Sequence, residues 1–92
     1  MDVITLLIQL RNPQGKIIPA TVIIKDGSSA LISKEKGLSK QLYESDKKSG
    51  LDVAYNSKIG AYIQNHKGKN KEQILEIIKE ELKRAGGSIL MQ

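Results

Sequence analysis

Two short apolar runs near the N-terminus restrict the possible folds more than any other feature of this chain. Residues 3–10 (VITLLIQL) and 17–25 (IIPATVIIK) are short and rich in β-branched residues, so both are predicted to be strands. The residues between them include Pro13 and Gly15, which are typical of turns. Two strands with such a short connection predict an antiparallel hairpin.

The run at 3–10 lacks the clean alternation of polar and apolar residues that a strand with one solvated face shows. Its composition therefore predicts burial on both of its faces. Pro19 lies near the start of the second run, where a missing backbone donor is tolerated, preferably in an edge strand. Residues 30–33 (ALIS) follow a turn at 26–29 (DGSS) and are a candidate for a short third strand.

The middle of the chain gives a weaker signal. A short helix is predicted near 38–45 from the near-helical spacing of its apolar residues. Residues 51–64 place several apolar side chains on one helical face, whereas Gly60 and the segment 52–55 (DVAY) are also compatible with a strand. A helix-turn-helix across both segments is a further interpretation, although the long polar connection does not match the usual tight turn.

The C-terminal third predicts a well-bounded helix. Asn70 is a good N-cap and Gln73 follows three residues later, as in a capping box, while Gly86 and Gly87 are typical of a helix end. One face of the helix is apolar: Ile74, Leu75, Ile77, Ile78 and Leu82. The segment 88–92 (SILMQ) is a candidate strand that closes a sheet edge within the chain or pairs with another copy.

These elements predict one small α+β domain over residues 1–92, with the N-terminal hairpin in a mainly antiparallel sheet and two or three helices on one sheet face. The 92 residues include no Phe, Trp or Cys, so Ile, Leu and Val must form the core and disulfides are excluded. Met1 and Asp2 do not begin a basic leader, and no apolar run is long enough to span a membrane. We therefore expect a cytoplasmic protein with no membrane partner.

The formal net charge is +5, which favours acidic partners such as nucleic acid or a small phosphate-bearing molecule. Lysine outnumbers arginine thirteen to two. Because lysine is a solvated point charge and arginine is the residue for bidentate recognition, this balance favours phosphate contacts over the reading of bases.

The main candidate for an anion site is the segment 65–73 (NHKGKNKEQ), at the predicted start of the last helix. Its predicted site residues are Lys67, Gly68, Lys69, Asn70 and Lys71. Backbone N–H groups and the helix dipole attract anions at a helix start, the glycine allows close approach, and the lysines add charge. The spacing is not that of a phosphate-binding loop. A solvated loop that ends in a helix cap is the alternative interpretation.

Two further loops, 33–37 (SKEKG) and 45–50 (SDKKSG), are rich in lysine, glycine and serine. If they lie at the same end of the domain as 65–71, they form one basic rim that includes Lys47 and Lys48 as secondary anion-binding residues. Taken singly, each loop is also typical of a solvated surface.

Tyr55 and Tyr62 are seven residues apart and could share one helical face. Exposed beside lysines, they would stack on a base, whereas in a core without Phe or Trp they would pack with their hydroxyls on a partner. His66, the only histidine, has no cysteine or carboxylate partner at metal-ligand spacing and is predicted to be a surface residue. No catalytic residue, metal site or cofactor is predicted.

The sequence thus predicts a non-enzymatic binding or regulatory protein with an anionic partner. The first alternative is a protein–protein adaptor or inhibitor of a bacterial or phage type, which uses a strand edge or an apolar margin near Tyr55, Tyr62 and Leu90. The second is a self-assembling homo-oligomer with a structural role.

Overall fold

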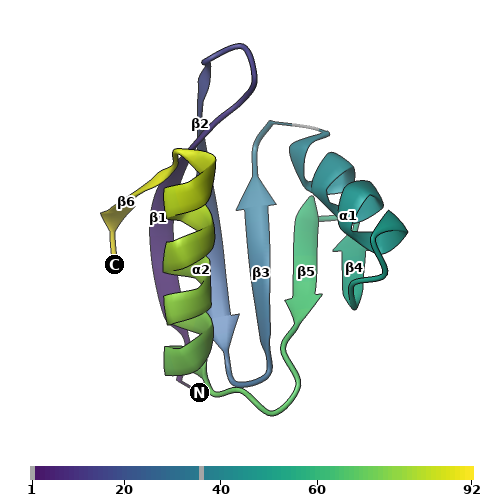
Figure 1. Ribbon diagram of the computed structural model, residues 1–92, viewed down its shortest axis with the longest axis vertical. Helices are drawn as coiled ribbons and strands as arrows, with labels where there is room; N and C mark the ends of the chain where they lie inside the picture. The colour runs from purple at the N-terminus through teal and green to yellow at the C-terminus, as the bar shows by residue number, and fades with distance from the viewer. Residues whose placement is uncertain (1, 36) are drawn as a thin grey trace.

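The computed structural model describes residues 2–35 and 37–92 (Figure 1). Those residues form one antiparallel sheet of six strands and two helices. In chain order the elements are β1 (Ile4–Arg11), β2 (Ile17–Lys25), β3 (Ser28–Ser33), α1 (Leu38–Lys48), β4 (Val53–Asn56), β5 (Ala61–Asn65), α2 (Lys71–Ala85) and β6 (Ser88–Met91). The strand order across the sheet is β4-β5-β3-β2-β1-β6.

Both helices cover the same face of the sheet (Figure 1). Leu6, Val22, Leu31 and Tyr62 are partners in one row across β1, β2, β3 and β5, so their side chains point to the same side. The row begins with Leu6 in the core under α2 and ends with Tyr62, which contacts α1. The domain therefore has two layers, and among the described residues no helix lies on the other face of the sheet.

The main core lies between α2 and the strands β1 and β2. Its buried members are Leu6, Ile8, Ala20, Val22, Ile24, Ile74, Leu75, Ile78 and Leu82. They include four of the five residues that the sequence places on the apolar face of the last helix. Each fully buried leucine or isoleucine of this set contributes about 1.5–3 kcal/mol to folding, so the contact between α2 and the sheet is the main source of stability.

The predicted bounds of the last helix are confirmed. The Asn70 side chain accepts from the backbone N–H of Gln73 at 2.9 Å, and the Gln73 side chain accepts from the backbone N–H of Asn70 at 3.0 Å. This is a complete capping box. At the other end Gly86 has φ 74°, a left-handed conformation that glycine adopts without a steric penalty.

The helix prediction for residues 51–64 is wrong, and the strand interpretation of its first part is the observed one. The segment forms the hairpin of β4 and β5, with Gly60 in the turn at φ 67°. Buried Val53 and half-buried Tyr55 alternate with exposed neighbours, which is the period of a strand. A helix-turn-helix is excluded for the same reason, because the second predicted helix is this hairpin.

The C-terminal segment forms β6, which pairs with β1 within the chain. Ile89 lies beside Ile8, and Met91 lies beside Leu7. Of the two expectations for this segment, edge closure within the chain is therefore the observed arrangement. No helix in the described part of the chain is long and apolar enough to cross a membrane.

Candidate functional site

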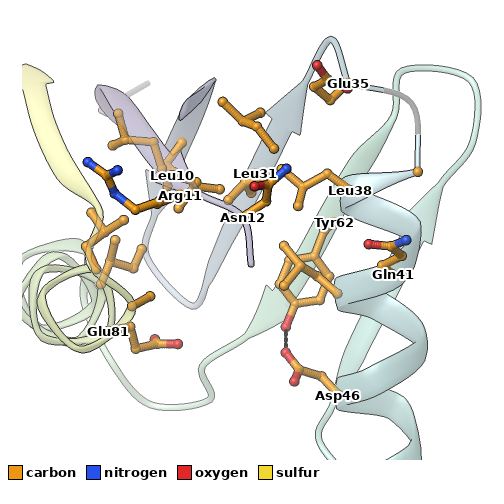
Figure 2. A pocket seen from close by; sticks show the side chains of 18 of the residues that line it. Leu10, Arg11, Asn12, Leu31, Glu35, Leu38, Gln41, Asp46, Tyr62 and Glu81 are labelled. Atoms are coloured by element: carbon orange, nitrogen blue, oxygen red, sulfur yellow. Dashed lines mark hydrogen bonds between the residues drawn. The ribbon is translucent and has the colours of Figure 1, made fainter. Parts of the chain in front are cut away.

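A cleft of about 690 Å³ opens between α1 and α2 on the helix-bearing face of the sheet (Figure 2). The two helices form its walls, and residues of β1, β2, β3 and β5 form its floor. The β1–β2 turn and the loop between β3 and α1 form one end of the cleft, where Lys16 Nζ lies 2.9 Å from Glu35 Oε1.

The cleft exists because the two helices sit on distant strands. α1 lies over β4 and β5, and α2 lies over β1 and β2. At about 4.8 Å per strand, the helices are separated by about 14 Å, or about three strand spacings. Helices in direct contact lie only about 8–10 Å apart. The remaining space of about 5 Å admits a ring or an alkyl chain but no third helix.

Leucines form most of the accessible apolar lining. Leu10, Leu31, Leu38 and Leu42 come from β1, β3 and α1, and all four remain partly exposed in the cleft. Figure 2 shows Leu31 and Leu38 close to one another above the floor. Leu10 and Leu31 point from the sheet toward the helix layer, and Leu38 and Leu42 line the α1 wall. A ligand in the cleft would remove their exposed parts from water.

One end of the floor is acidic. The hydroxyl of Tyr62 donates a hydrogen bond to the carboxylate of Asp46 on α1 (Figure 2). Tyr62 is only 5% exposed. Burial, followed by the hydrogen bond and charge of Asp46, raises the pKa of Tyr62 well above its ordinary range. The tyrosine therefore keeps its proton and fixes the position of the Asp46 carboxylate.

A second carboxylate enters the cleft from the opposite wall. Figure 2 shows Glu81 on α2, across the cleft from Asp46 on α1. The Glu81 residue as a whole is exposed, yet partial desolvation of its carboxylate raises the pKa of Glu81, the charge of Asp46 raises it further, and Arg84 partly opposes the shift. Neither carboxylate forms an ion pair with another of the described residues. Of the three described acidic residues that line the cleft, Glu35 pairs with Lys16 at the end where Arg11 lies, whereas Asp46 and Glu81 share the rest of the cleft without an ion pair.

At the predicted anion site at the start of α2, two backbone N–H groups are already hydrogen-bonded within the chain. The backbone N–H of Lys71 donates to Asp26 Oδ1 at 2.8 Å, and that of Gln73 donates to Asn70. The chain's own side chains thus occupy donors that an external anion would use. The capped-helix alternative accounts for these contacts, while anion binding by Lys67, Gly68, Lys69, Asn70 and Lys71 stays a prediction that depends on the lysine side chains.

The lysine-rich loops do not meet at one rim. The backbone N–H of Asn65 donates to the carbonyl of Asp52 at 3.0 Å, which places the end of α1, with Lys47 and Lys48, at the same end of the sheet as 65–71. Residues 33–35 and 37 of the third loop lie at the opposite end, beside the β1–β2 turn, and residue 36 lies outside the described residues. Only two of the three loops therefore share an end of the molecule.

Tyr55 and Tyr62 pack against other residues of the chain, and neither ring is exposed in the way that stacking on a base requires. Tyr62 is buried in the floor of the cleft, which corrects its interpretation as a ring exposed to a base. Tyr55 is half-buried, and its ring stacks on that of Tyr43 of α1 with the centroids 6.0 Å apart. The stacking partner of Tyr55 is thus another residue of the chain.

His66 is not the isolated surface residue that the sequence predicts. Its Nε2 lies 3.2 Å from Oγ of Ser29, which is 5% exposed, and the histidine itself is half-buried. Desolvation, then the charge of Lys69, lowers the pKa of His66. No carboxylate among the described residues is hydrogen-bonded to the other ring nitrogen, so the pair lacks the third group that orients a catalytic base. Only the pairing of β3 with β5 brings these two residues together.

The acidic cleft residues were missed at the sequence level, although the sequence carries a weak signal for them. Asp46 follows Leu38 and Leu42 at intervals of four residues, so it continues their helical face. Glu81 follows Ile77 and Ile78 at four and three residues in the same way. An acidic residue in line with an apolar helical face indicates a face that is not fully buried.

Comparison of the chain with models of protein families, with curated proteins and with solved structures gives no match. The functional proposal below rests on the chemistry of the cleft.

Proposed function

We propose that the chain is a non-enzymatic binding protein and that the cleft between α1 and α2 takes a small amphipathic cation. Such a ligand has an apolar body and a positively charged head, for example an ammonium group. The observation that carries the proposal is the pair of carboxylates, Asp46 and Glu81, that face one apolar cleft from opposite walls.

The apolar body would lie on the leucines. The cleft volume of about 690 Å³ falls within the range of roughly 300–1,000 Å³ that is typical of small-molecule sites. Leu31 on the floor and Leu38 and Leu42 on the α1 wall offer partly exposed apolar surface. Burying this surface supplies the non-directional part of the affinity.

The charged head would lie between Asp46 and Glu81. Their mutual repulsion and partial desolvation raise the free energy of the ionised pair, as the pKa of Glu81 indicates. A cation between them would relieve both effects. The Tyr62 hydroxyl holds Asp46 in place, so the geometry of this half of the site exists before the ligand arrives.

Binding fits this arrangement better than catalysis. A general base needs a free lone pair at the reacting group and a pKa suited to accept a proton. The Asp46 carboxylate already accepts from Tyr62, and burial keeps the Tyr62 proton in place. These two groups are therefore suited to hold a ligand in position.

The test compares three ligands with the same alkyl chain, namely octylammonium, octanol and octanoate, by isothermal titration calorimetry. We expect octylammonium to bind most tightly and octanoate most weakly. Asp46→Asn and Glu81→Gln should each weaken octylammonium about three- to tenfold, the range for one partly solvated charge contact.

Two matched variants serve as controls. Glu44→Gln on α1 and Glu80→Gln on α2 remove the same charge from exposed positions of the same helices, and neither residue lines the cleft. They should leave the affinity for octylammonium unchanged. Equal binding of the three ligands, or equal losses in the cleft and control variants, would contradict the proposal.

A further inference from the structure

The face of the sheet opposite the helices carries two adjacent rows of small and large side chains. The first row, in order across β1, β2, β3, β5 and β4, is Leu7, Thr21, Ile32, Ala61 and Asn56. The second row, in the same order, is Thr5, Ile23, Ala30, Ile63 and Ala54. The register thus defines a continuous surface, which we call the open face, across five strands.

Large and small residues alternate on the open face in both directions. Across the strands, Ile32 lies between Thr21 and Ala61, and Ala30 lies between Ile23 and Ile63. Along β3, Ala30 in one row is followed by Ile32 in the other. The same holds along β2 and β5. A large side chain of the open face therefore lies beside a small one at almost every position of the two rows.

The two rows contain no charged residue at any of their described positions. Arg11 and Lys25 lie on the same side of the sheet but at the ends of β1 and β2. Leu7 is 43% exposed, and Met91 beside it on β6 is 64% exposed. An uncharged surface of this extent is unusual for the solvent face of an antiparallel sheet, which normally alternates to polar residues.

The prediction that β1 is buried on both faces is wrong for a single copy of the chain. The strand's lack of polar alternation predicts burial on both faces. The helices bury Leu6 and Ile8 on one side, whereas Leu7 on the other side remains exposed. Whatever covers the open face would complete the burial of this strand.

We propose that a second copy of this chain covers the open face, in a sheet-on-sheet dimer with two-fold symmetry. A two-fold interface brings the same patch of both copies together, so it requires a self-complementary surface. The alternation of Ile with Ala and Thr meets that requirement, because each isoleucine can enter a hollow over an alanine of the other copy. Packed sheets interdigitate in this way about 10 Å apart.

The outline of the molecule leaves room for an interface of standard size. The longest two dimensions of the molecule are 35 and 28 Å, and both lie in the plane of Figure 1, in which the sheet is seen from its helix side. These dimensions set an upper limit of about 1,000 Å² for the open face with its margins, compared with about 800 Å² per partner in a standard interface. The exposed apolar rim formed by Leu7, Ile17 and Met91 lies at the margin of this area.

The charge distribution favours a dimer through this face over one through the helices. Each copy carries +5, so contact between two copies must avoid the lysines. Face-to-face packing places the two uncharged centres together and leaves Arg11 and Lys25 at the solvated margin. Association should therefore strengthen with added salt, because screening reduces the repulsion between the copies.

The experiment is sedimentation equilibrium over a wide range of protein concentration, with circular dichroism to verify the fold of each variant. We expect a concentration-dependent mass that approaches twice 10.2 kDa. Ile32→Lys puts a charge at the centre of the open face and should raise the dimer dissociation constant about a hundredfold or more, since a buried unpaired charge is costly. Leu7→Lys tests the same face at a position that already reaches solvent, so it keeps the test valid if Ile32→Lys does not fold.

Ile59→Lys and Leu51→Lys are the matched controls. Ile59 is 57% exposed and Leu51 is 50% exposed, and both lie outside the two rows, in the β4–β5 turn and between α1 and β4. They should leave the dissociation constant unchanged. A monomeric mass at all concentrations would overturn the proposal, including a monomer that binds neutral lipid vesicles. A dimer that survives Ile32→Lys and Leu7→Lys would overturn it as well, because its contact must then lie elsewhere, for example at the β4 or β6 edge.

Discussion

The two faces of the sheet are similar in apolar composition, but the two described helices cover only one of them. In β2 the residues that point to the helices are Ile18, Ala20, Val22 and Ile24, and those that point to the open face are Ile17, Pro19, Thr21 and Ile23. The first set is buried, and the second is exposed or half-buried. Apolar side chains on a strand thus indicate that something covers them, but they do not distinguish a helix of the same chain from a partner.

The sharpest test of this comparison uses two neighbouring isoleucines of β2. Ile24 is fully buried under α2, and Ile23 lies on the open face. We expect Ile24→Ala to lower the free energy of unfolding by about 2–5 kcal/mol and Ile23→Ala by less than about 1 kcal/mol, since only the first leaves a cavity in a packed core. Strand propensity is lost equally in both and cancels from the difference.

Urea denaturation at low protein concentration, where the chain is monomeric, measures both values. Repeating it at high concentration should enlarge the effect of Ile23→Ala alone, because dimer formation contributes to stability only when the open face is intact. Equal losses for the two variants at low concentration would mean that the faces do not differ in the monomer.

The sequence accounts for the parts of this fold that depend on local signals. The capping box at Asn70 and the turn at Gly86 depend on contacts within a few residues, so the local sequence is sufficient to define both ends of α2. The helix prediction for 51–64 is wrong although Ile59, Tyr62 and Ile63 have helical spacing, because Tyr62 and Ile63 are neighbours in β5 and point to opposite faces of the sheet. Only pairing with β3 and coverage by α1 select the hairpin.

The candidate site was predictable to a smaller extent. Asp46, Glu81 and Leu31 lie on three elements that are far apart in sequence, and the gap between the helices depends on the strand order. Strand order is a property of long-range pairing, which leaves no mark within any short stretch of residues. The lysines of 65–71 were conspicuous in sequence, yet Asp26, from the β2–β3 turn, already binds the backbone there.

The stability of the helix-bearing face also depends on close packing between β1 and the end of α2. A Cβ at Gly87 would lie 2.7 Å from the carbonyl oxygen of Gln9 and 3.0 Å from Cδ2 of Leu82. Gly87→Ala should therefore cost about 1–3 kcal/mol, as overpacking does. Ser88→Ala, at the next and exposed position, should cost less than about 0.5 kcal/mol. A tolerated Gly87→Ala would mean that α2 can move away from β1 without loss, as measured by thermal unfolding of both variants.

The start of α2 is attached to the β2–β3 turn by the side chain of Asp26, next to a backbone hydrogen bond from Gly27 N–H to the carbonyl of Lys69. Asp26 in the β2–β3 turn accepts from the backbone N–H of Lys71, so Asp26→Ala should lower stability by about 1 kcal/mol through loss of a charged cap. Inorganic phosphate should then stabilise this variant and not the original chain, because the vacated donor becomes available to an anion. If phosphate stabilises both proteins equally in thermal unfolding, the lysines of 65–71 bind anions without the backbone N–H of Lys71, whereas the sequence-based hypothesis combines the lysines with backbone donors.

The smallest expected effect is the pH dependence that Glu81 gives to the helix-bearing face. Because desolvation and Asp46 raise its pKa above the ordinary value of 4.5, the folded chain holds this proton more tightly than the unfolded chain. The corresponding stabilisation is complete below pH 4.5 and is lost as the pH rises through the raised pKa. Glu81→Gln should remove this part of the pH profile, and Glu80→Gln should keep it. Octylammonium should oppose the shift, because a cation in the cleft stabilises the ionised carboxylate and so lowers its pKa. A profile that octylammonium and Glu81→Gln leave unchanged would remove Glu81 from the site, and only Asp46 would then remain to hold the charged head.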